Sequence, residues 1–260
     1  MKSVILCEGG DDLWFLAYYL HKRARWAPTA IINSIWKNYQ ISALNNRQEV
    51  KCFSCGNDHV VIWSACGKDS FEKSIQSVLH LIDTYPFDPV DSIVIVRDRD
   101  DDSTPQILES MESWIGNNIR LENKTTSTLY REIDDCYVKT YFTPVIIPFS
   151  EEGAIETILK RAIKEQGEEE STIVDEADKY ISALMTTGLV GNKYLSHCRL
   201  VLKARYSAVI AATNPDHSTG LFQSMVMACP WEQSSHVKEH FDVVLNAISE
   251  KESFEKSLRL

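Results

Sequence analysis

Glycine and proline are scarce in this chain, which has 10 glycines and 8 prolines among 260 residues. Because both are thinly spread, no long flexible linker is visible. Hydrophobic residues make up 44% of the sequence and aromatic residues 10%, which is enough to bury a core. The sequence therefore predicts a folded chain, made of one α/β domain with an appended piece or of two small domains, and excludes a largely disordered one.

Positively charged residues are fewer than negatively charged ones. The chain has 27 Lys and Arg residues against 37 Asp and Glu residues, which gives a net charge of −10. A protein that coats DNA regardless of its sequence is usually basic, so we expect any nucleic-acid contact to be confined to a patch. A nuclease is not excluded, because an enzyme that gathers carboxylates around a divalent cation is locally acidic until the cation binds.

Long apolar runs are missing, and none approaches the roughly 18 residues needed to span a membrane. No signal-peptide pattern is visible, since Met1-Lys2-Ser3 leads straight into a strand-like segment. The seven cysteines are odd in number and irregularly spaced, which favours reduced thiols over a disulfide framework. We therefore expect a cytoplasmic protein without a membrane segment.

What the chain does contain is a repeated order of short apolar runs and amphipathic segments. The apolar runs predict strands at residues 3–7, 59–65, 92–96 and 141–147. Apolar residues at helical spacing predict helices at residues 13–25, 71–83, 106–115, 152–165, 178–212 and 237–249. This alternation predicts an α/β fold, with a parallel sheet flanked by helices over residues 1–165 and a mostly helical C-terminal extension over residues 166–260 packed on it.

Polar residues gather at the predicted strand ends, where ligands bind in sheets of this kind. The residues expected at this edge are Glu8, Lys68, Asp98, Asp100 and Glu152. Gly9 and Gly10 follow Glu8 and leave room for a phosphate or a metal ion to approach the backbone. Taken alone, this segment is equally an ordinary turn into a helix, with acidic caps at Asp11 and Asp12.

The second acidic motif is Asp98-Arg99-Asp100, directly after the strand predicted at residues 92–96. Because side chains alternate along a strand, residues i and i+2 face the same side, so we expect both carboxylates to reach one Mg²⁺ ion. An acidic, solvated loop remains an alternative, because Asp101 and Asp102 continue the run. Each of these two acidic motifs is a weak signal alone, and the prediction of a metal site depends on their occurrence together.

Taken in order, the strand-Glu-Gly-Gly-Asp-Asp-helix unit, the Gly-Lys turn and the Asp-x-Asp turn resemble the Toprim domain over about residues 3–160. The chain is similar to small stand-alone Toprim proteins related to the overcoming-lysogenization-defect (OLD) nucleases. Ile147-Pro148, followed by Glu152 and Glu156, resembles the downstream acidic segment of those proteins. Residues 203–231 look like the helical tail of an uncharacterised Toprim-like family.

This resemblance implies a Mg²⁺ site, with Mn²⁺ as a possible substitute. Glu8 would be the Toprim glutamate, a metal ligand or an acid/base, and Asp98 and Asp100 would be the metal-binding pair. The remaining roles would fall to Glu152 and Glu156 at a second metal, to Lys68 and Lys203 beside the scissile phosphate, and to Gly9 and Gly10 as phosphate-binding backbone. For Glu152 and Glu156 a structural explanation stays open, because acids at the start of a helix favour its dipole.

Among Toprim activities, a nuclease needs the fewest additional parts, since topoisomerases and primases need further modules for which the chain has no room. The resemblance thus implies hydrolysis of DNA or RNA, in phage defence or nucleic-acid processing, and it is compatible with a homodimer. Cys66-Gly67-Lys68-Asp69 lacks the spacing of a P-loop, so any ATP-driven step would belong to a partner ATPase. Two alternatives remain: a non-catalytic Toprim-like binding module, and a small-molecule phosphotransferase or hydrolase with Asp98 as nucleophile.

Other candidate clusters are weaker. Cys52 and Cys55 begin a zinc pattern, but His59 and Cys66 bracket a predicted strand and would lie roughly 20 Å apart. His236 and His240 lack an evident third ligand, so we expect a solvated helix face. A further pair, Arg199 and Lys203, would share a helix face on which both side chains could hold phosphates.

Overall fold

A computed structural model describes residues 1–39, 41, 49–116, 118–133, 135–188, 193–218 and 221–249. The chain forms two compact units. The first consists of Met1–Arg97, Ser103–Ile146 and the segment from Phe241 onward, and the second of Asp98–Asp102 and Ile147–His240. The boundary predicted at residue 165 thus falls inside the second unit.

The first unit is built on a seven-stranded sheet in the order β2-β3-β4-β1-β5-β7-β6. The strands are β1 (Lys2–Cys7), β2 (Ala27–Thr29), β3 (Val50–Cys55), β4 (Asp58–Ser64), β5 (Ser92–Asp98), β6 (Ser127–Ile133) and β7 (Cys136–Ile147). The central strands β4, β1 and β5 are parallel, as predicted. Outside them, β2 and β3, β3 and β4, and β6 and β7 pair antiparallel, so the predicted parallel strands form the centre of a mixed sheet.

The β3–β4 hairpin explains part of this difference. Cys55 pairs with Asp58, so the turn holds only Gly56 and Asn57, and Gly56 has a φ of +57°. A two-residue turn of this kind needs positive φ, which glycine adopts without cost. The Gly-Asn pair before the strand predicted at residues 59–65 is therefore the signal that would have revealed β3.

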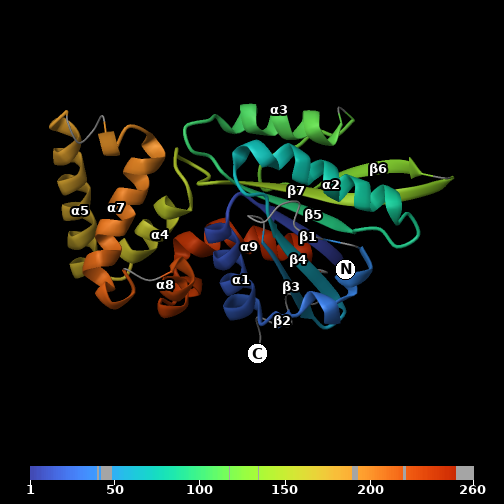
Figure 1. The fold of residues 1–260 in the computed structure, drawn as a ribbon, viewed down its shortest axis with the longest axis horizontal. Coiled ribbons are helices and arrows are strands. Elements are labelled where there is room, and N and C mark those ends of the chain that lie inside the picture. The colour runs from blue at the N-terminus through green and yellow to red at the C-terminus, as the bar shows by residue number, and fades with distance from the viewer. Residues whose placement is uncertain are drawn as a thin grey trace. The chain divides into compact units, whose positions relative to one another are not determined.

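Helices α2 (Phe71–Thr84) and α3 (Thr104–Ile115) lie side by side over one face of the sheet (Figure 1). Both contribute to one hydrophobic core with side chains from alternate strand positions, such as Leu6, Trp63 and Ile95. The apolar residues of α2 recur at helical spacing and are buried, so this stripe holds the helix on the sheet. The strand residues between these positions face the opposite side, because side chains alternate along a strand.

On that opposite side lie α1 (Gly10–Ala24) and the C-terminal part of α9 (Ser235–Ile248). The Phe15 and Phe241 rings are 4.9 Å apart, centroid to centroid. Asp242 accepts hydrogen bonds from the Tyr19 hydroxyl at 2.6 Å and from Arg23 Nη2 at 3.1 Å. Burial, followed by the bond to Asp242, raises the pKa of Tyr19, so the phenol stays a donor. The first unit thus needs the end of the described chain to cover this face.

The second unit is mostly helical. Its helices are α4 (Ile155–Lys164), α5 (Glu168–Thr186), α7 (Cys198–Thr213), α8 (Phe222–Ala228) and the first residues of α9. Helices α4, α5 and α7 contact one another pairwise and lie together in Figure 1. Lys160 Nζ lies 2.7 Å from Asp178 Oδ2 and joins α4 to α5. The predicted α/β class with a helical C-terminal part is therefore confirmed.

The helix predicted at residues 178–212 is interrupted in the part of the chain that the structure describes, where α5 ends at Thr186 and α7 begins at Cys198. The first, α5, begins earlier, where Glu168, Glu169 and Glu170 fill the first turn and suit the helix dipole. After α5 ends at Thr186, Gly188 adopts a φ of +67°, the left-handed conformation common just beyond a helix. The chain is therefore free to start α7 anew at Cys198.

Two further features concern the part of the chain that the structure describes. No helix there has the length and apolar character needed to cross a membrane. The seven cysteines all lie within it, and none forms a disulfide.

Candidate functional site

The carboxyl ends of the central parallel strands carry the polar residues that the sequence singled out. Cys7 pairs with Ser64 of β4 and with Val96 of β5. Glu8 comes directly after β1, Lys68 follows the end of β4, and Asp98 is the last residue of β5. The backbone thus places these residues at strand ends, as predicted.

Glu8 is buried at the end of β1, with only 1% of its surface exposed. Its carbonyl accepts a hydrogen bond of 2.8 Å from Gly67 N, which ties β1 to the loop after β4. That loop continues into Lys68, whose side chain is exposed. The sequence therefore brings the first acidic motif and the Gly-Lys turn together within the first unit.

The two glycines after Glu8 lead directly into α1. Gly9 is the N-cap residue, and its N–H donates to Asp12 Oδ2 at 2.8 Å. Gly10 is the first residue of the helix. Because Asp12 already accepts the Gly9 amide, the structural explanation of this turn is sufficient, and the phosphate-binding role of Gly9 and Gly10 stays a prediction.

Asp98 has a defined structural partner in the second unit. Its side chain is buried, and Oδ1 accepts a hydrogen bond of 3.1 Å from the backbone N–H of Ile155, the first residue of α4. Ala154, the N-cap residue of α4, provides no side-chain cap. Asp98 therefore caps α4 from a distant part of the chain, at the positive end of the helix dipole.

Asp100 is fixed by its backbone rather than by its side chain. It has a φ of +52°, and it forms an antiparallel bridge with Gly153, in which Asp100 N donates to Gly153 O at 2.6 Å and Gly153 N donates to Asp100 O at 2.8 Å. Within the described chain, Asp100 Oδ1 is buried and has no hydrogen-bond partner. A buried carboxylate oxygen of this kind is suited to a cation.

Gly153 makes this arrangement possible. It has a φ of +136°, which side chains rarely permit, and a Cβ at this position would overlap Thr157 Oγ1. Strand alternation thus ends at Asp98, because the left-handed Asp100 follows. Asp98 binds the start of α4 whereas Asp100 lines a cavity, so the two carboxylates have different surroundings.

The downstream acids also have separate environments. Glu152 is exposed, and it lines the same cavity as Asp100. Glu156 is buried in the first turn of α4, with Oε1 3.6 Å from Lys203 Nζ. This ion pair joins α4 to α7 and accounts for both residues structurally, so their proposed contacts with metal and phosphate stay predictions.

Several observations bear on metal binding. Within the described ranges, no group of three or more His, Cys, Asp and Glu side chains is assembled as a metal centre. Mg²⁺ is commonly held by only one or two carboxylates, with water and substrate phosphates completing the shell. The open oxygen of Asp100 fits that kind of site. Burial is the main cause that raises the pKa of Cys52 and of Cys55, which favours the thiol over the metal-binding thiolate.

His240 does not lie on a solvated helix face, contrary to the prediction. It is 4% exposed, its Nε2 accepts from Phe149 N at 3.2 Å, and its Nδ1 lies 2.7 Å from His236 O. Burial, as the largest cause, lowers the pKa of His240. The neutral ring, with the proton on Nδ1, satisfies both contacts, so this histidine has a structural role.

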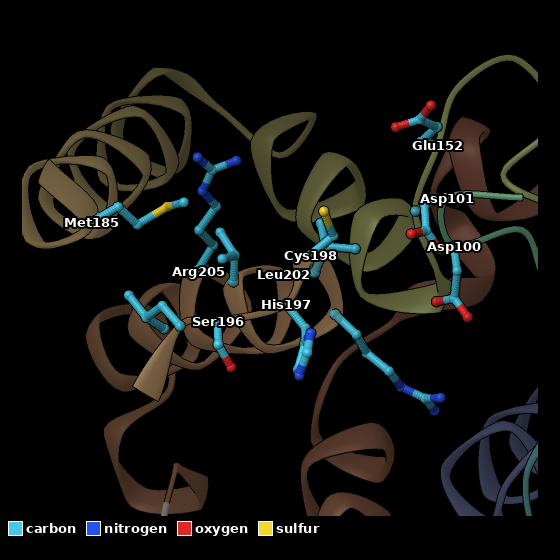
Figure 2. A pocket seen from close by; sticks show the side chains of 13 residues that line it. Asp100, Asp101, Glu152, Met185, Ser196, His197, Cys198, Leu202 and Arg205 are labelled. Atoms are coloured by element: carbon cyan, nitrogen blue, oxygen red, sulfur yellow. The ribbon is translucent and has the colours of Figure 1, made fainter. Parts of the chain in front are cut away.

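A cavity of about 560 Å³ lies entirely among residues of the second unit. Figure 2 shows Asp100, Asp101 and Glu152 at one end, Met185 and Arg205 at the other, and His197 and Cys198 between them. His197 is the N-cap residue of α7 and Cys198 its first residue. The cavity therefore has an acidic end, a helix N-terminus in its wall and a cationic end.

Sequence reasoning missed most of this cavity. Of its lining residues, Asp100 and Glu152 were predicted as metal ligands and Arg199 as a phosphate contact, but the wall formed by Met185, His197 and Cys198 was not predicted. The predicted helix ran through His197 and Cys198, so its true N-terminus was hidden. The signal that could have divided it is Gly188, at a position where a helix commonly ends.

Fold and site together define an α/β protein with a mixed sheet, carboxylates at its central strand ends and a helical C-terminal part. The chain belongs to the family described as protein of unknown function (DUF3226), whose model matches residues 2–250. No curated protein matches it. Among solved structures, a hypothetical protein from Pyrococcus horikoshii OT3 is 18% identical, with a TM-score of 0.47, over 90% of this chain and 98% of that chain.

Proposed function

We propose that this protein is a Mg²⁺-dependent nuclease of Toprim type, similar to the OLD-related nucleases, that hydrolyses phosphodiester bonds of DNA or RNA. The observation that supports it best is the register of β4, β1 and β5, in which Cys7 faces both Ser64 and Val96. This register puts Glu8 and Asp98 just beyond paired positions of neighbouring parallel strands. Such strand ends are the usual place for ligands in α/β sheets.

In this proposal the chain's own residues divide the work. Glu8, Asp98 and Asp100 supply the carboxylates, and Asp100 contributes a buried oxygen that lacks a hydrogen bond within the described chain. The cap on α4 fixes the orientation of Asp98. Lys68 supplies positive charge near the phosphate. When bound, Mg²⁺ supplies Lewis-acid stabilisation of the charge that develops on the phosphoryl oxygens.

The proposal extends to the setting of the enzyme. We place it in the cytoplasm, where its seven cysteines stay reduced. Its partner is nucleic acid, and any ATP-driven step comes from a separate ATPase. A homodimer and a role in phage defence or nucleic-acid processing complete the proposal, and they rest on the Toprim resemblance alone.

The test is cleavage of end-labelled single- and double-stranded DNA and RNA with Mg²⁺ or Mn²⁺. The wild type is compared with Glu8→Gln, Asp98→Asn and the control Glu72→Gln, an exposed residue in the first turn of α2. Asparagine keeps an oxygen that can accept the Ile155 amide, so Asp98→Asn removes charge without removing the α4 cap.

We expect cleavage by the wild type and the control, and none by the two site variants. Retained cleavage by both site variants would refute the proposed metal site. If the wild type binds nucleic acid without cleaving it under any condition, the protein is instead a non-catalytic binding module.

A further inference from the structure

The cavity of the second unit has the size and lining of a small-molecule site. Its volume of about 560 Å³ lies within the range of roughly 300–1,000 Å³ that is usual for ligand pockets. Met185, Leu195 and Leu202 provide apolar surface. A flat, largely apolar group such as a nucleobase fits this wall.

One end of the cavity carries Arg205, whose guanidinium group has only long or neutral contacts with its neighbours. Arg205 Nη2 donates to Ser182 Oγ at 3.1 Å, and Arg205 Nε lies 3.8 Å from Asp178 Oδ1. Both oxygens of Asp178 already accept from Lys160 Nζ, at 2.8 and 2.7 Å. Asp178 is therefore bound mainly to Lys160, and a ligand with negative charge would give Arg205 a closer partner.

Two buried polar atoms of residues that line the cavity lack a hydrogen-bond partner, which also favours a ligand. Arg205 Nε is a buried donor without a hydrogen-bond acceptor in the described chain, and Asp100 Oδ1, at the acidic end, is a buried acceptor without a donor. Buried polar groups are costly when they have no partner. The other donors of Arg205 and the other oxygen of Asp100 would bind an anionic group and a cation at the two ends of the cavity.

The wall between the two ends also favours an anion. α7 begins there at Cys198, and its first-turn amides and dipole attract negative charge. The acidic end formed by Asp100, Asp101 and Glu152 would repel the same anion unless a divalent cation lay between them. Anion binding in this cavity should therefore strengthen when Mg²⁺ is present.

We propose that this cavity binds a nucleotide with a terminal phosphate group, the base against the apolar wall and the phosphate between Arg205 and the start of α7. This inference rests on the proposed function, which it narrows to a nuclease that engages phosphorylated strand ends. A free mononucleotide has the same base and terminal phosphate as a phosphorylated strand end, so the experiment distinguishes these two ligands.

The first measurement is isothermal titration of the full chain with AMP and with adenosine, each with and without Mg²⁺. We expect AMP to bind in the presence of Mg²⁺ and to lose affinity without it, and adenosine to bind about 10- to 100-fold more weakly. Arg205→Gln should weaken AMP by a similar factor, whereas the exposed Lys179→Gln on α5 should not. Circular dichroism of each variant checks the fold.

The second measurement compares oligonucleotides that carry a 5′-phosphate, a 3′-phosphate or only hydroxyl ends, as competitors of AMP and as cleavage substrates. Preference for one phosphorylated end supports the strand-end inference, and AMP binding without such a preference assigns the cavity to free nucleotides instead. Equal binding of AMP and adenosine to the wild type overturns the inference, whatever the variants do. If AMP binds but no substrate is cleaved, the nucleotide site in the cavity is supported and the nuclease proposal is rejected. If substrates are cleaved at rates that depend neither on end phosphates nor on AMP, the nuclease proposal is supported and the nucleotide site is rejected.

Discussion

At the scale of single residues, the acidic segment after β5 combines two tasks in adjacent positions. Asp98 gives one carboxylate oxygen to the start of α4, and Asp100 is clamped by its backbone to Gly153 with one oxygen left open. The structural contact of Asp98 fixes the direction of the segment, and Asp100 is one of the residues that line the cavity. An Asp-x-Asp motif can therefore be part structural and part chemical, although its two carboxylates look alike in sequence.

Gly153 is the residue on which this arrangement depends most. We expect Gly153→Ala to lower the free energy of unfolding by about 1–3 kcal/mol, because its φ of +136° is strained for alanine and the new Cβ would overlap Thr157. Urea unfolding followed by circular dichroism measures the change. Gly167→Ala is the matched control, since its backbone is extended and only the flexible end of Glu170 lies nearby. Equal stability of the two variants would show that Gly153 does not constrain this segment.

At the scale of elements, α9 is held at its start by a residue from α4's end. Glu165 accepts hydrogen bonds from Ser234 Oγ at 2.7 Å and from Ser235 N at 3.0 Å. Burial raises the pKa of Glu165, but the hydrogen bonds from Ser235 and Ser234 outweigh it and lower the pKa to about 2. The charged carboxylate therefore stabilises the folded chain.

This contact predicts a pH dependence with a defined sign. The pKa of Glu165 is lower in the folded chain than its unfolded value near 4.5. Its contribution to the free energy of unfolding is therefore complete above about pH 4.5 and is lost as the pH falls towards 2. Glu165→Gln should lower the free energy of unfolding by about 0.5–1 kcal/mol at pH 7, a modest loss since the group is exposed. The difference from wild type should shrink between pH 4.5 and 2.

Denaturant titrations at several pH values measure this difference. Glu132→Gln, at an exposed position of β6, is the control and should match the wild type throughout. A Glu165→Gln effect that stays constant down to pH 2 would contradict the charged cap.

Comparison of the predicted with the observed elements shows which parts of the fold and of the candidate site could be predicted from the sequence. The central strands and α1, α2 and α3 were predicted near their observed positions. Their positions depend on local features of the sequence, namely the spacing of apolar residues and the capping residues at helix ends. β3 and β6 were missed, since both mix polar residues into a short strand and gain their order from the neighbouring strand. The residues at the strand ends were predictable from topology, but Arg205 and Gly153 were not, because their importance arises from contacts across distant segments.

At the scale of the whole molecule, the net charge of −10 means that long-range attraction does not draw nucleic acid to this protein. Binding must depend on a few local contacts with phosphates. If the nuclease proposal holds, KM for a single-stranded substrate should rise about three- to sevenfold between roughly 50 and 200 mM salt, as expected for one or two such contacts, with little change in kcat. Steady-state kinetics across this range measure both, and a flat KM would count against phosphate contacts.

The path of the chain between its two units affects how the protein is made. Phe241, Val244 and Leu245, at the far end of the described chain, are fully buried, and from Phe241 onward the chain belongs to the first unit. During synthesis, the sheet and its helices α1, α2 and α3 leave the ribosome long before these residues. The face shared by α1 and α9 thus stays open while the whole second unit is translated. The N-terminal unit, although begun first, is therefore complete only after the residues from Phe241 onward have been made.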